Sequence, residues 1–391
     1  MTNDQRALDR ITHVEAIPIA LPLRREWLWR GLGEPLGRWV IVRVHAESGL
    51  VGLGEATPLA DWGGDHGRYY GETPATVIHL VRDVFGPLLR SLDPFDIELA
   101  IDRMDAVVRG HFYAKAAVEM ALHDLRGRVT GQPLYRLIGG RARDGVPVAH
   151  MIGIMPADEA AEEAAAAISD GARALQVKGT GEPDRDVALI DRLRGALGEG
   201  IVLRLDANQG YRDAKLAIRT VRRLGEAGAD LVEQPTQGLE RMAHVRRSVD
   251  VPIIADESCW QPEDAAQIGI RGAADAISVY LAKAGGITRA QRVAAVADAF
   301  GLPCDVNGSL ESGVGNAANL HFALATPAVR LACVIPVSAP AGTGPAVVGR
   351  YYADDLVTRP FEFADGCLLP LEEPGLGIEL DEEKLVAYRL D

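Results

Sequence analysis

After Arg141, short apolar runs alternate with longer alanine-rich stretches that have the apolar spacing of amphipathic helices. This alternation is typical of a parallel sheet, because each strand needs a crossover, usually a helix, to reach the next one. Eight such runs predict a (β/α) barrel, although the pattern by itself also fits an open sheet. The runs are VAHMIG, ALQVKG, IVLRLDANQ, DLVEQP, VPIIADES, AISVYLAK, LPCDVNG and LACVIP.

The segment before the barrel has a different pattern. Residues 11–57 contain three strand-like runs, and a Ser-Gly pair marks the turn between the second and third. Three stretches with helical spacing follow, near residues 72–92, 96–109 and 113–131. Strands followed by helices predict an α+β domain.

These patterns divide the 391 residues into three parts. We expect an α+β capping domain at 11–140 and the barrel at 146–350. The acidic, proline-containing segment 351–391 is expected to fold back onto the capping domain.

Composition excludes some classes of function. No apolar run is long enough to span a bilayer, and the first ten residues lack the apolar core of a secretory signal, so we expect a cytoplasmic protein. The formal charge of -14 is spread along the chain and argues against nucleic-acid binding. An anionic substrate remains compatible with this charge, because a metal ion can reverse the local potential of an acidic site.

Four ionisable residues lie at the ends of consecutive predicted strands. Lys178, Asp206, Glu233 and Asp256 are separated by 28, 27 and 23 residues, each about one βα unit. The carboxyl ends of barrel strands meet at one rim, so we expect these side chains to converge. Strand alternation also turns Gln176 toward the barrel axis, beside Lys178.

Three carboxylates around one point need a counter-charge. No His or Cys accompanies Asp206, Glu233 and Asp256 in this pattern, and oxygen ligands are those that a hard divalent cation prefers. The sequence therefore predicts a Mg²⁺ site, in which Mn²⁺ could substitute.

Five motifs resemble the barrel motifs of the enolase superfamily, in the muconate-lactonising subgroup of the mandelate racemase/muconate lactonizing enzyme family. They are RLDANQGY (204–211), LVEQP (231–235), ADES (255–258), KAGGI (283–287) and GSLES (308–312). Residues 117–140 also resemble the closing helix of the family's capping domain and the loop into the barrel. The resemblance covers nearly the whole chain.

The resemblance implies a modified TIM barrel, (β/α)7β, with an α+β capping domain built from both ends of the chain. It also implies an isomerase or lyase that removes the α-proton of a small carboxylate and forms an enediolate. Lys178 would then be the base, Glu311 would lie near the substrate carboxylate, and Asn208 would neighbour the metal. The implied metal ligands are Asp206, Glu233 and Asp256.

The sequence departs from the family pattern at two positions. Gln176 stands where the family usually has the first lysine of a Lys-x-Lys motif, so one cation that would lower the pKa of Lys178 is absent. Tyr280 stands where the subgroup usually has a second lysine, and Lys283 is expected in the following loop. Tyr280 is either a proton donor or acceptor opposite Lys178, or a residue that packs against or hydrogen-bonds to the substrate.

The departures leave several reactions open. We expect β-elimination or cycloisomerisation on the Lys178 face, and the alternative is epimerisation with Tyr280 as the second group. Two hypotheses from other classes are a Schiff-base aldolase that uses Lys178 and a metal-binding protein without turnover. We further expect a homo-oligomer.

Substrate specificity is expected to come from the loops at 24–35 and 60–73. Their aromatic and acidic residues could line a pocket for a cationic or cyclic amine-bearing acid, or could serve only as packing anchors. The candidate substrate-binding residues are Trp27, Trp29, Trp62, Gln176, Asn208, Lys283 and Asn307, and Asp61, Asp65, Tyr69 and Tyr70 are further members of the loops.

Overall fold

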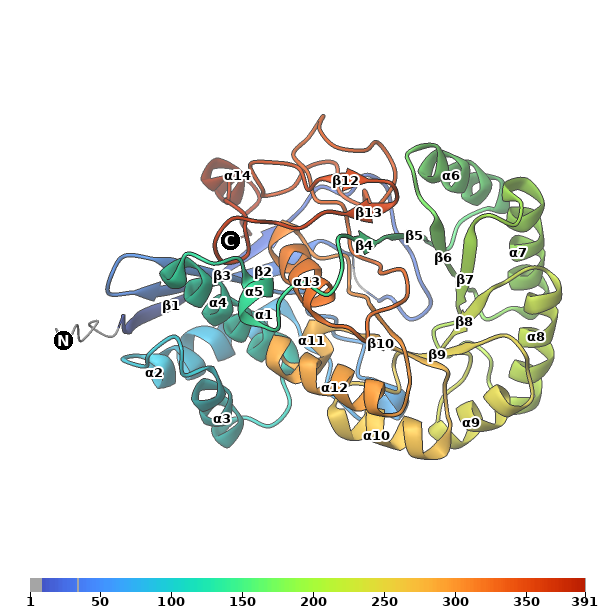
Figure 1. The fold of residues 1–391 in the computed structure, drawn as a ribbon, viewed down its shortest axis with the longest axis horizontal. Helices are drawn as coiled ribbons and strands as arrows, with labels where there is room; N and C mark the ends of the chain where they lie inside the picture. The colour runs from blue at the N-terminus through green and yellow to red at the C-terminus, as the bar shows by residue number, and fades with distance from the viewer. Residues whose placement is uncertain (1–8, 34, 391) are drawn as a thin grey trace.

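The structure, a computed structural model, describes residues 9–33 and 35–390. Most of the polar N-terminal stretch that the sequence analysis considered lies outside the described residues. Figure 1 shows the N-terminal strands and helices on one side and the strands of a barrel on the other. In the described part of the chain, no helix is long and apolar enough to cross a membrane.

The capping domain is an antiparallel meander covered by helices. Strands β1 (Ile11–Ala20), β2 (Arg38–Ala46) and β3 (Val51–Ala56) lie in that order. The helical elements are η1 (Asp65–Gly67), α1 (Pro74–His79), η2 (Leu80–Phe85), α2 (Gly86–Leu89), α3 (Ile97–Val107), α4 (Phe112–Thr130) and α5 (Leu134–Leu137).

Helix α4 lies directly on β3, and two glycines allow this contact. A Cβ atom at Gly54 would lie 1.9 Å from the carbonyl oxygen of Ala117, and one at Gly52 would lie 2.0 Å from that of Ala121. No side chain fits at such distances, so Gly52 and Gly54 let the two backbones approach closely. This contact fixes the long helix against the sheet.

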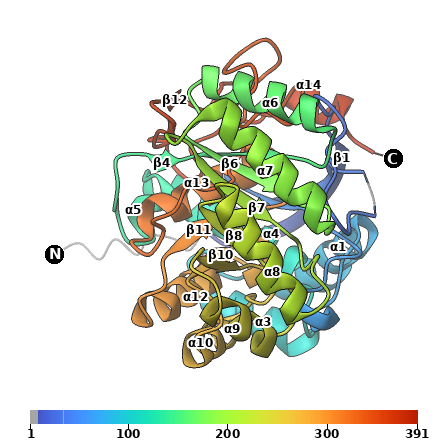
Figure 2. The same ribbon diagram turned by 90° about the vertical axis from the view of Figure 1, so that its right-hand side faces the viewer.

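The barrel contains seven parallel strands in sequential order from β5 to β11. They are β5 (Ala149–Ile152), β6 (Ala174–Lys178), β7 (Val202–Asp206), β8 (Leu231–Glu233), β9 (Ile253–Ala255), β10 (Ala276–Val279) and β11 (Cys304–Val306). The helices that follow them are α6 (Ala157–Ser169), α7 (Pro183–Leu197), α8 (Ala214–Glu226), α9 (Leu239–Arg247), α10 (Pro262–Arg271), α11 (Leu281–Ala284), α12 (Ile287–Ala299) and α13 (Gly313–Ala325). Figure 2 shows α6, α7 and α8 across the outer side of the strands.

The last apolar run, residues 331–336, closes the barrel without forming a regular strand. The Ala149 N–H of β5 donates to the Cys333 carbonyl at 2.8 Å, and the Val334 N–H donates to the Val306 carbonyl of β11 at 2.9 Å. These isolated bonds join the run to both ends of the seven-stranded sheet. We expected this run to be an eighth strand, but it pairs only through isolated bridges. The predicted modified TIM barrel is confirmed.

The C-terminal segment lies against the capping domain. The Ala20 N–H donates to the Tyr388 carbonyl at 2.8 Å, and the Leu390 N–H donates to the Pro18 carbonyl at 2.9 Å, so this end of the chain pairs with β1. A second small sheet joins β12 (Phe363–Ala364), β13 (Cys367–Leu368) and β4 (Val146–Pro147), and α14 (Glu382–Ala387) follows.

Candidate active site

The four ionisable residues predicted at strand ends lie together at one end of the barrel. Lys178, Asp206 and Glu233 are direct partners in the register of β6, β7 and β8, and Asp256 immediately follows β9. All four side chains are buried. They are adjacent because neighbouring parallel strands end at the same level.

Each of the three carboxylates lies beside a basic side chain. Lys178 Nζ donates to Asp206 Oδ2 at 2.5 Å, and Lys283 Nζ donates to Asp256 Oδ1 at 2.6 Å. Arg204 Nε lies 3.4 Å from Glu233 Oε2, and the Gln176 amide donates to the same oxygen at 2.8 Å. Each carboxylate is thus bound by its own cation. In the described part of the chain, the three carboxylates do not each place one oxygen within 4.8 Å of the others.

Burial and repulsion between the acids persist despite these cations. Burial, followed by the neighbouring Asp206 carboxylate, raises the pKa of Glu233 to about 8. Burial also raises the pKa of Asp256, although Lys283 opposes this shift. Next to them, Glu257 Oε2 and Asn208 Oδ1 are buried without a hydrogen-bond partner. Oxygen donors with unfavourable negative charge suit a hard divalent cation, so this set of residues fits Mg²⁺.

Two backbone turns position the metal-site candidates. Asn208 adopts a left-handed conformation with φ of 39°, and its N–H donates to Asp206 Oδ1 at 3.0 Å. Gln234 has φ of 37°, and its side-chain oxygen accepts from the Asp256 N–H at 2.9 Å. Positive φ at a non-glycine residue carries strain that surrounding bonds must hold. The loops after β7 and β8 are therefore locked in place around the carboxylates.

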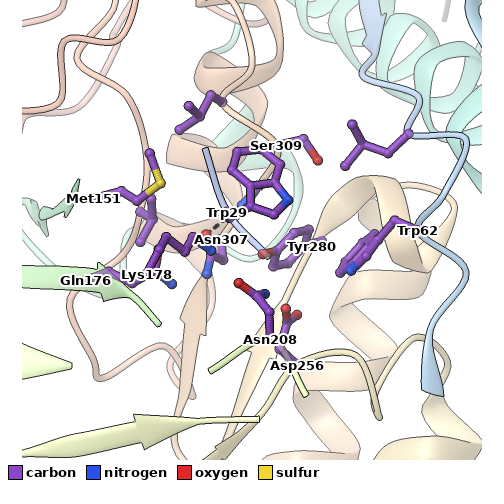
Figure 3. A pocket seen from close by; sticks show the side chains of 14 residues that line it. Trp29, Trp62, Met151, Gln176, Lys178, Asn208, Asp256, Tyr280, Asn307 and Ser309 are labelled. Atoms are coloured by element: carbon purple, nitrogen blue, oxygen red, sulfur yellow. Dashed lines mark hydrogen bonds between the residues drawn. The ribbon is translucent and has the colours of Figure 1, made fainter. Parts of the chain in front are cut away.

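A small pocket opens above these groups. The capping domain contributes Trp29 and Trp62 from its two loops, and the barrel contributes the remaining polar side chains, as Figure 3 shows. The lining residues are Trp29, Leu59, Trp62, Met151, Gln176, Lys178, Asn208, Asp256, Tyr280, Asn307, Gly308, Ser309, Leu310 and Val334.

Tyr280 and Lys178 lie on different sides of this pocket. In Figure 3 the tyrosine hydroxyl points inward, toward the side where Lys178 and Asn307 lie. The Tyr280 ring packs against Trp62, with centroids 5.3 Å apart, and Lys283 Nζ lies 4.4 Å from its centroid. Burial, and then the Asp256 carboxylate, raise the pKa of Tyr280 well above its ordinary value. The phenol is therefore neutral in this structure.

The expectation for Lys283 was wrong. We expected it in a loop, where it could contact substrate. Instead it lies on α11, is 1% exposed, and also donates to the backbone oxygens of Asp256 and Ser278 at 2.9 Å each. A helix begins directly after Tyr280, so three residues turn the lysine back beneath the tyrosine ring. Lys283 supports Asp256 and is absent from the pocket lining.

Several other candidates also lie outside the pocket. Trp27 is buried and donates through its indole to the Tyr351 carbonyl at 3.0 Å, so it anchors its loop. Tyr70 is 65% exposed, and the Tyr69 hydroxyl donates to Asp264 at 2.6 Å. Glu311 is buried behind the lining, where its carboxylate accepts from the Ser309 N–H at 3.1 Å. The structure thus separates loop anchors from the pocket-facing Trp29 and Trp62.

Sequence reasoning missed several parts of the site. Arg204 is buried on the same side of β7 as Asp206 and bonds to Asp305, and Met151 lines the pocket from β5. Strand alternation could have indicated Arg204, which stands two residues before Asp206. Ser309 also lines the pocket, and its place in the GSLES motif could have indicated this.

Comparison with known proteins places this geometry in a family. Residues 36–139 match the "Mandelate racemase / muconate lactonizing enzyme, N-terminal domain" model, and residues 159–384 match the "Enolase C-terminal domain-like" model. The chain is 31% identical to N-succinyl-L-Arg/Lys racemase of Bacillus cereus over 378 residues, which covers 96% of this chain and 97% of the relative. It is 33% identical to muconate cycloisomerase 1 of Rhodococcus opacus over 384 residues, with 97% and 98% covered.

A solved structure agrees with these matches. The muconate lactonizing enzyme from Pseudomonas fluorescens, complexed with muconolactone, superposes with a TM-score of 0.88 at 31% identity, covering 98% of this chain and all of the other. The chain therefore belongs to the mandelate racemase/muconate lactonizing enzyme family of the enolase superfamily, and it is an enzyme of that isomerase group.

Proposed function

We propose that the protein is a Mg²⁺-dependent isomerase in which Lys178 removes the α-proton of a small carboxylate to give an enediolate. The observation that carries this proposal is the placement of the Lys178 amino group at the pocket, in register with Asp206 and Glu233. The α-proton is weakly acidic, because its removal adds negative charge to an anionic group. A preorganised site is needed to stabilise that charge.

Asp206, Glu233 and Asp256 would hold the Mg²⁺, and Mn²⁺ could replace it. When bound, this ion supplies Lewis-acid stabilisation of the charge that develops on the substrate carboxylate. The chain itself holds the ligands in place through Gln176 and Lys283, which bond to Glu233 and Asp256.

Burial and two carboxylates act on the charge of Lys178 in opposite directions. Burial lowers the pKa of Lys178, but the Asp206 and Glu233 carboxylates outweigh this effect and raise it in the structure. If a bound cation neutralised those carboxylates, burial would be the main influence on the pKa of Lys178. It would then favour the neutral amine that a base requires. Gln176 contributes no charge, so the carboxylates decide how far the pKa of Lys178 departs from the value set by burial.

The neutral state of Tyr280 favours chemistry on one face of the substrate. A phenol whose pKa is raised can donate a hydrogen bond or a proton, but it is a poor base. Lys178 then removes the α-proton, and the enediolate collapses to a carbon–carbon double bond as the bond from Cβ to a ring oxygen breaks, so that the leaving group stays attached to the same molecule. In the reverse direction the ring closes and Lys178 returns the proton to the α-carbon, which is cycloisomerisation; β-elimination of a group that departs would share the proton-removal step.

Epimerisation is the second candidate. Tyr280 lies across the pocket from Lys178, where a second proton-transfer group would be needed, and one of the relatives reported above is a racemase. This reaction requires Tyr280 to return a proton to the opposite face of the enediolate. A Schiff-base aldolase and an inert metal-binding protein find no support among these isomerase relatives.

The pocket lining favours a substrate whose remainder is uncharged. Among the described residues that line it, Lys178 is the one lysine or arginine, and much of the wall is aromatic or aliphatic. Lys178 Nζ lies 5.4 Å from the Trp29 ring, and Lys283 Nζ lies 5.8 Å from the Trp62 ring. A cationic substrate group on the Trp62 ring would meet the like charge of Lys283, and most of the remaining wall is uncharged, so we now favour an apolar or aromatic group over the amine considered from sequence.

Solvent deuterium uptake tests the proposal before the product is known. A library of small carboxylates with aromatic or aliphatic substituents is incubated with the enzyme and Mg²⁺ in D₂O and followed by NMR. We expect α-deuteration by the wild type and by Lys215→Ala, which removes an exposed lysine on α8. Lys178→Ala should show none. Equal exchange by the wild type and Lys178→Ala would contradict the proposed base.

A further inference from the structure

A second group of metal-type ligands lies on the capping-domain sheet. His13 on β1 and His45 on β2 are direct cross-strand partners, and Glu15 follows His13 by two residues. Residues two apart point to the same face of a strand, so all three side chains share one face. Figure 1 shows β1 well away from the barrel strands that carry the active-site carboxylates.

The three side chains present their ligand atoms to one another. The imidazole rings are stacked, with centroids 4.0 Å apart and an interplanar angle of 11°. His45 Nε2 lies 3.2 Å from one Glu15 oxygen, and His13 Nε2 lies 3.9 Å from the other. One ligand atom from each residue lies within 4.8 Å of the others. Tetrahedral zinc places ligand atoms about 3.4 Å apart, so the distances suit zinc, but one imidazole must leave the stack before both lone pairs can meet at one ion.

His13 is the residue that can make this rearrangement. Its side chain is 55% exposed, whereas that of His45 is 22% exposed, so the His13 ring can turn without disturbing the core. To leave the stack, the ring pivots about its Nδ1 contact with Thr12, which directs its Nε2 lone pair toward the point faced by His45 and Glu15.

A threonine sets the tautomer that metal binding requires. The Thr12 hydroxyl donates to the His45 carbonyl at 3.1 Å, and it also lies 3.1 Å from His13 Nδ1. Because the hydroxyl proton is directed to the carbonyl, Thr12 accepts from Nδ1–H of His13. The lone pair of His13 then lies on Nε2, on the side of Glu15.

The remaining contacts leave the ligands available. His45 Nε2 is buried without a hydrogen-bond partner, and it faces the Glu15 carboxylate. Arg43 is the cross-strand partner of Glu15, but its guanidinium donates to Glu382 at 2.5 Å. Among the described residues, the ion-pair distances of Glu15 are therefore to the two imidazoles.

We propose that His13, Glu15 and His45 form a Zn²⁺ site that joins β1 to β2. Two imidazoles and one carboxylate suit Zn²⁺ better than Mg²⁺, and three protein ligands leave a fourth position for water. A metal that binds only the folded chain stabilises it, so zinc would strengthen the pairing of the first two strands. This site is separate from the proposed catalytic metal and does not depend on it.

Zinc binding to the purified 391-residue protein tests the proposal. Isothermal titration with ZnCl₂ is run in excess Mg²⁺, so that differences between variants report the capping-domain site. We expect His13→Ala and His45→Ala each to lose one bound zinc per chain or to weaken it at least tenfold. Thr12→Val, which keeps all three ligands, should weaken it about 10-fold to 100-fold.

The matched control is His79→Ala. His79 is another exposed histidine beside a carboxylate, since its Nδ1 lies 2.8 Å from Asp83 Oδ2, but among the described residues it belongs to no group of three metal-type ligands. The His79→Ala variant should bind zinc like the wild type. Zinc should raise the melting temperatures of the wild type and of His79→Ala, but not that of His13→Ala. Equal zinc affinity in the wild type, His13→Ala and Thr12→Val would overturn the proposal.

Discussion

Lys178 and Asp206 are direct partners on adjacent strands, and Lys178 Nζ donates to Asp206 Oδ2 at 2.5 Å. The proposed base and a proposed metal ligand therefore share one ion pair. A cation held by Asp206 would compete with Lys178 for this carboxylate. Such competition couples metal occupancy to the freedom of the lysine, so we expect the two to act together.

Metal removal should abolish activity. Incubation with a chelator is expected to reduce α-proton exchange to background, and Mg²⁺ should restore it, because the buried carboxylates would otherwise repel the substrate carboxylate. Asp206→Asn and Glu233→Gln should each lower exchange at least about 100-fold while the circular dichroism spectrum stays native.

The control for these variants is Asp184→Asn. Asp184 is 91% exposed and pairs with Arg223 on the barrel surface, so its loss changes a carboxylate without touching the site. It should keep full activity. Full exchange in a metal-free buffer would remove the basis for the metal assignment.

Replacement of Lys283 should destabilise the protein in a way that Mg²⁺ repairs. Lys283→Met leaves the buried Asp256 carboxylate without its cation, and loss of one partner of a buried ion pair costs about 3–5 kcal/mol. Bound Mg²⁺ would supply the missing charge. Thermal melting with and without Mg²⁺ should therefore show a larger Mg²⁺-induced gain in Lys283→Met than in the wild type, while Lys215→Met behaves like the wild type.

The arrangement of the strand-end residues could be predicted because the βα repeat determines it. Each repeat returns the chain to the same rim, so regular spacing of Lys178, Asp206, Glu233 and Asp256 predicts their meeting without knowledge of any loop. Alternation likewise identified Gln176, which lines the pocket beside Lys178.

The loop residues could not be separated by the same reasoning. Trp27 and Trp29 stand two residues apart, yet the first packs against Tyr351 and the second faces the pocket. A loop has no repeat that fixes side-chain direction. The direction of each side chain therefore depends on the contacts of the loop with the rest of the fold. Lys283 was misplaced for a related reason, since the short helix after Tyr280 interrupts the pattern of the strand.

A buried histidine should make stability depend on pH. Burial lowers the pKa of His321 from 6.5 to about 4. Its Nδ1 accepts from the Tyr135 N–H at 3.2 Å and its Nε2 donates to the Leu376 carbonyl at 3.1 Å, so the neutral ring satisfies both partners. Between pH 6.5 and 4 the unfolded chain binds the proton more readily. The contribution of His321 to the free energy of unfolding should therefore be fully present above pH 6.5. It should fall by about 3 kcal/mol as the pH drops toward 4.

Denaturant titrations of the wild type and His321→Gln measure this contribution. The variant should be less stable at pH 7, and the difference between the two proteins should shrink as the pH falls toward 4. Burial also lowers the pKa of His150, so both proteins keep some pH dependence and only their difference reports on His321. A difference that does not change with pH would mean that His321 does not titrate in this window.

Tyr280→Phe should distinguish the two candidate reactions. The substitution removes the hydroxyl that points into the pocket while the ring keeps its packing against Trp62. Since the raised pKa keeps the phenol neutral, we expect it to assist a later step, not to remove the α-proton. The variant should therefore retain Lys178-dependent deuterium exchange of one stereoisomer and form product at least about 10-fold more slowly. Stereospecific NMR in D₂O follows both isomers of the substrate. If the wild type exchanges both and Tyr280→Phe silences only the isomer whose α-proton faces the phenol, Tyr280 is a second base and the enzyme is an epimerase.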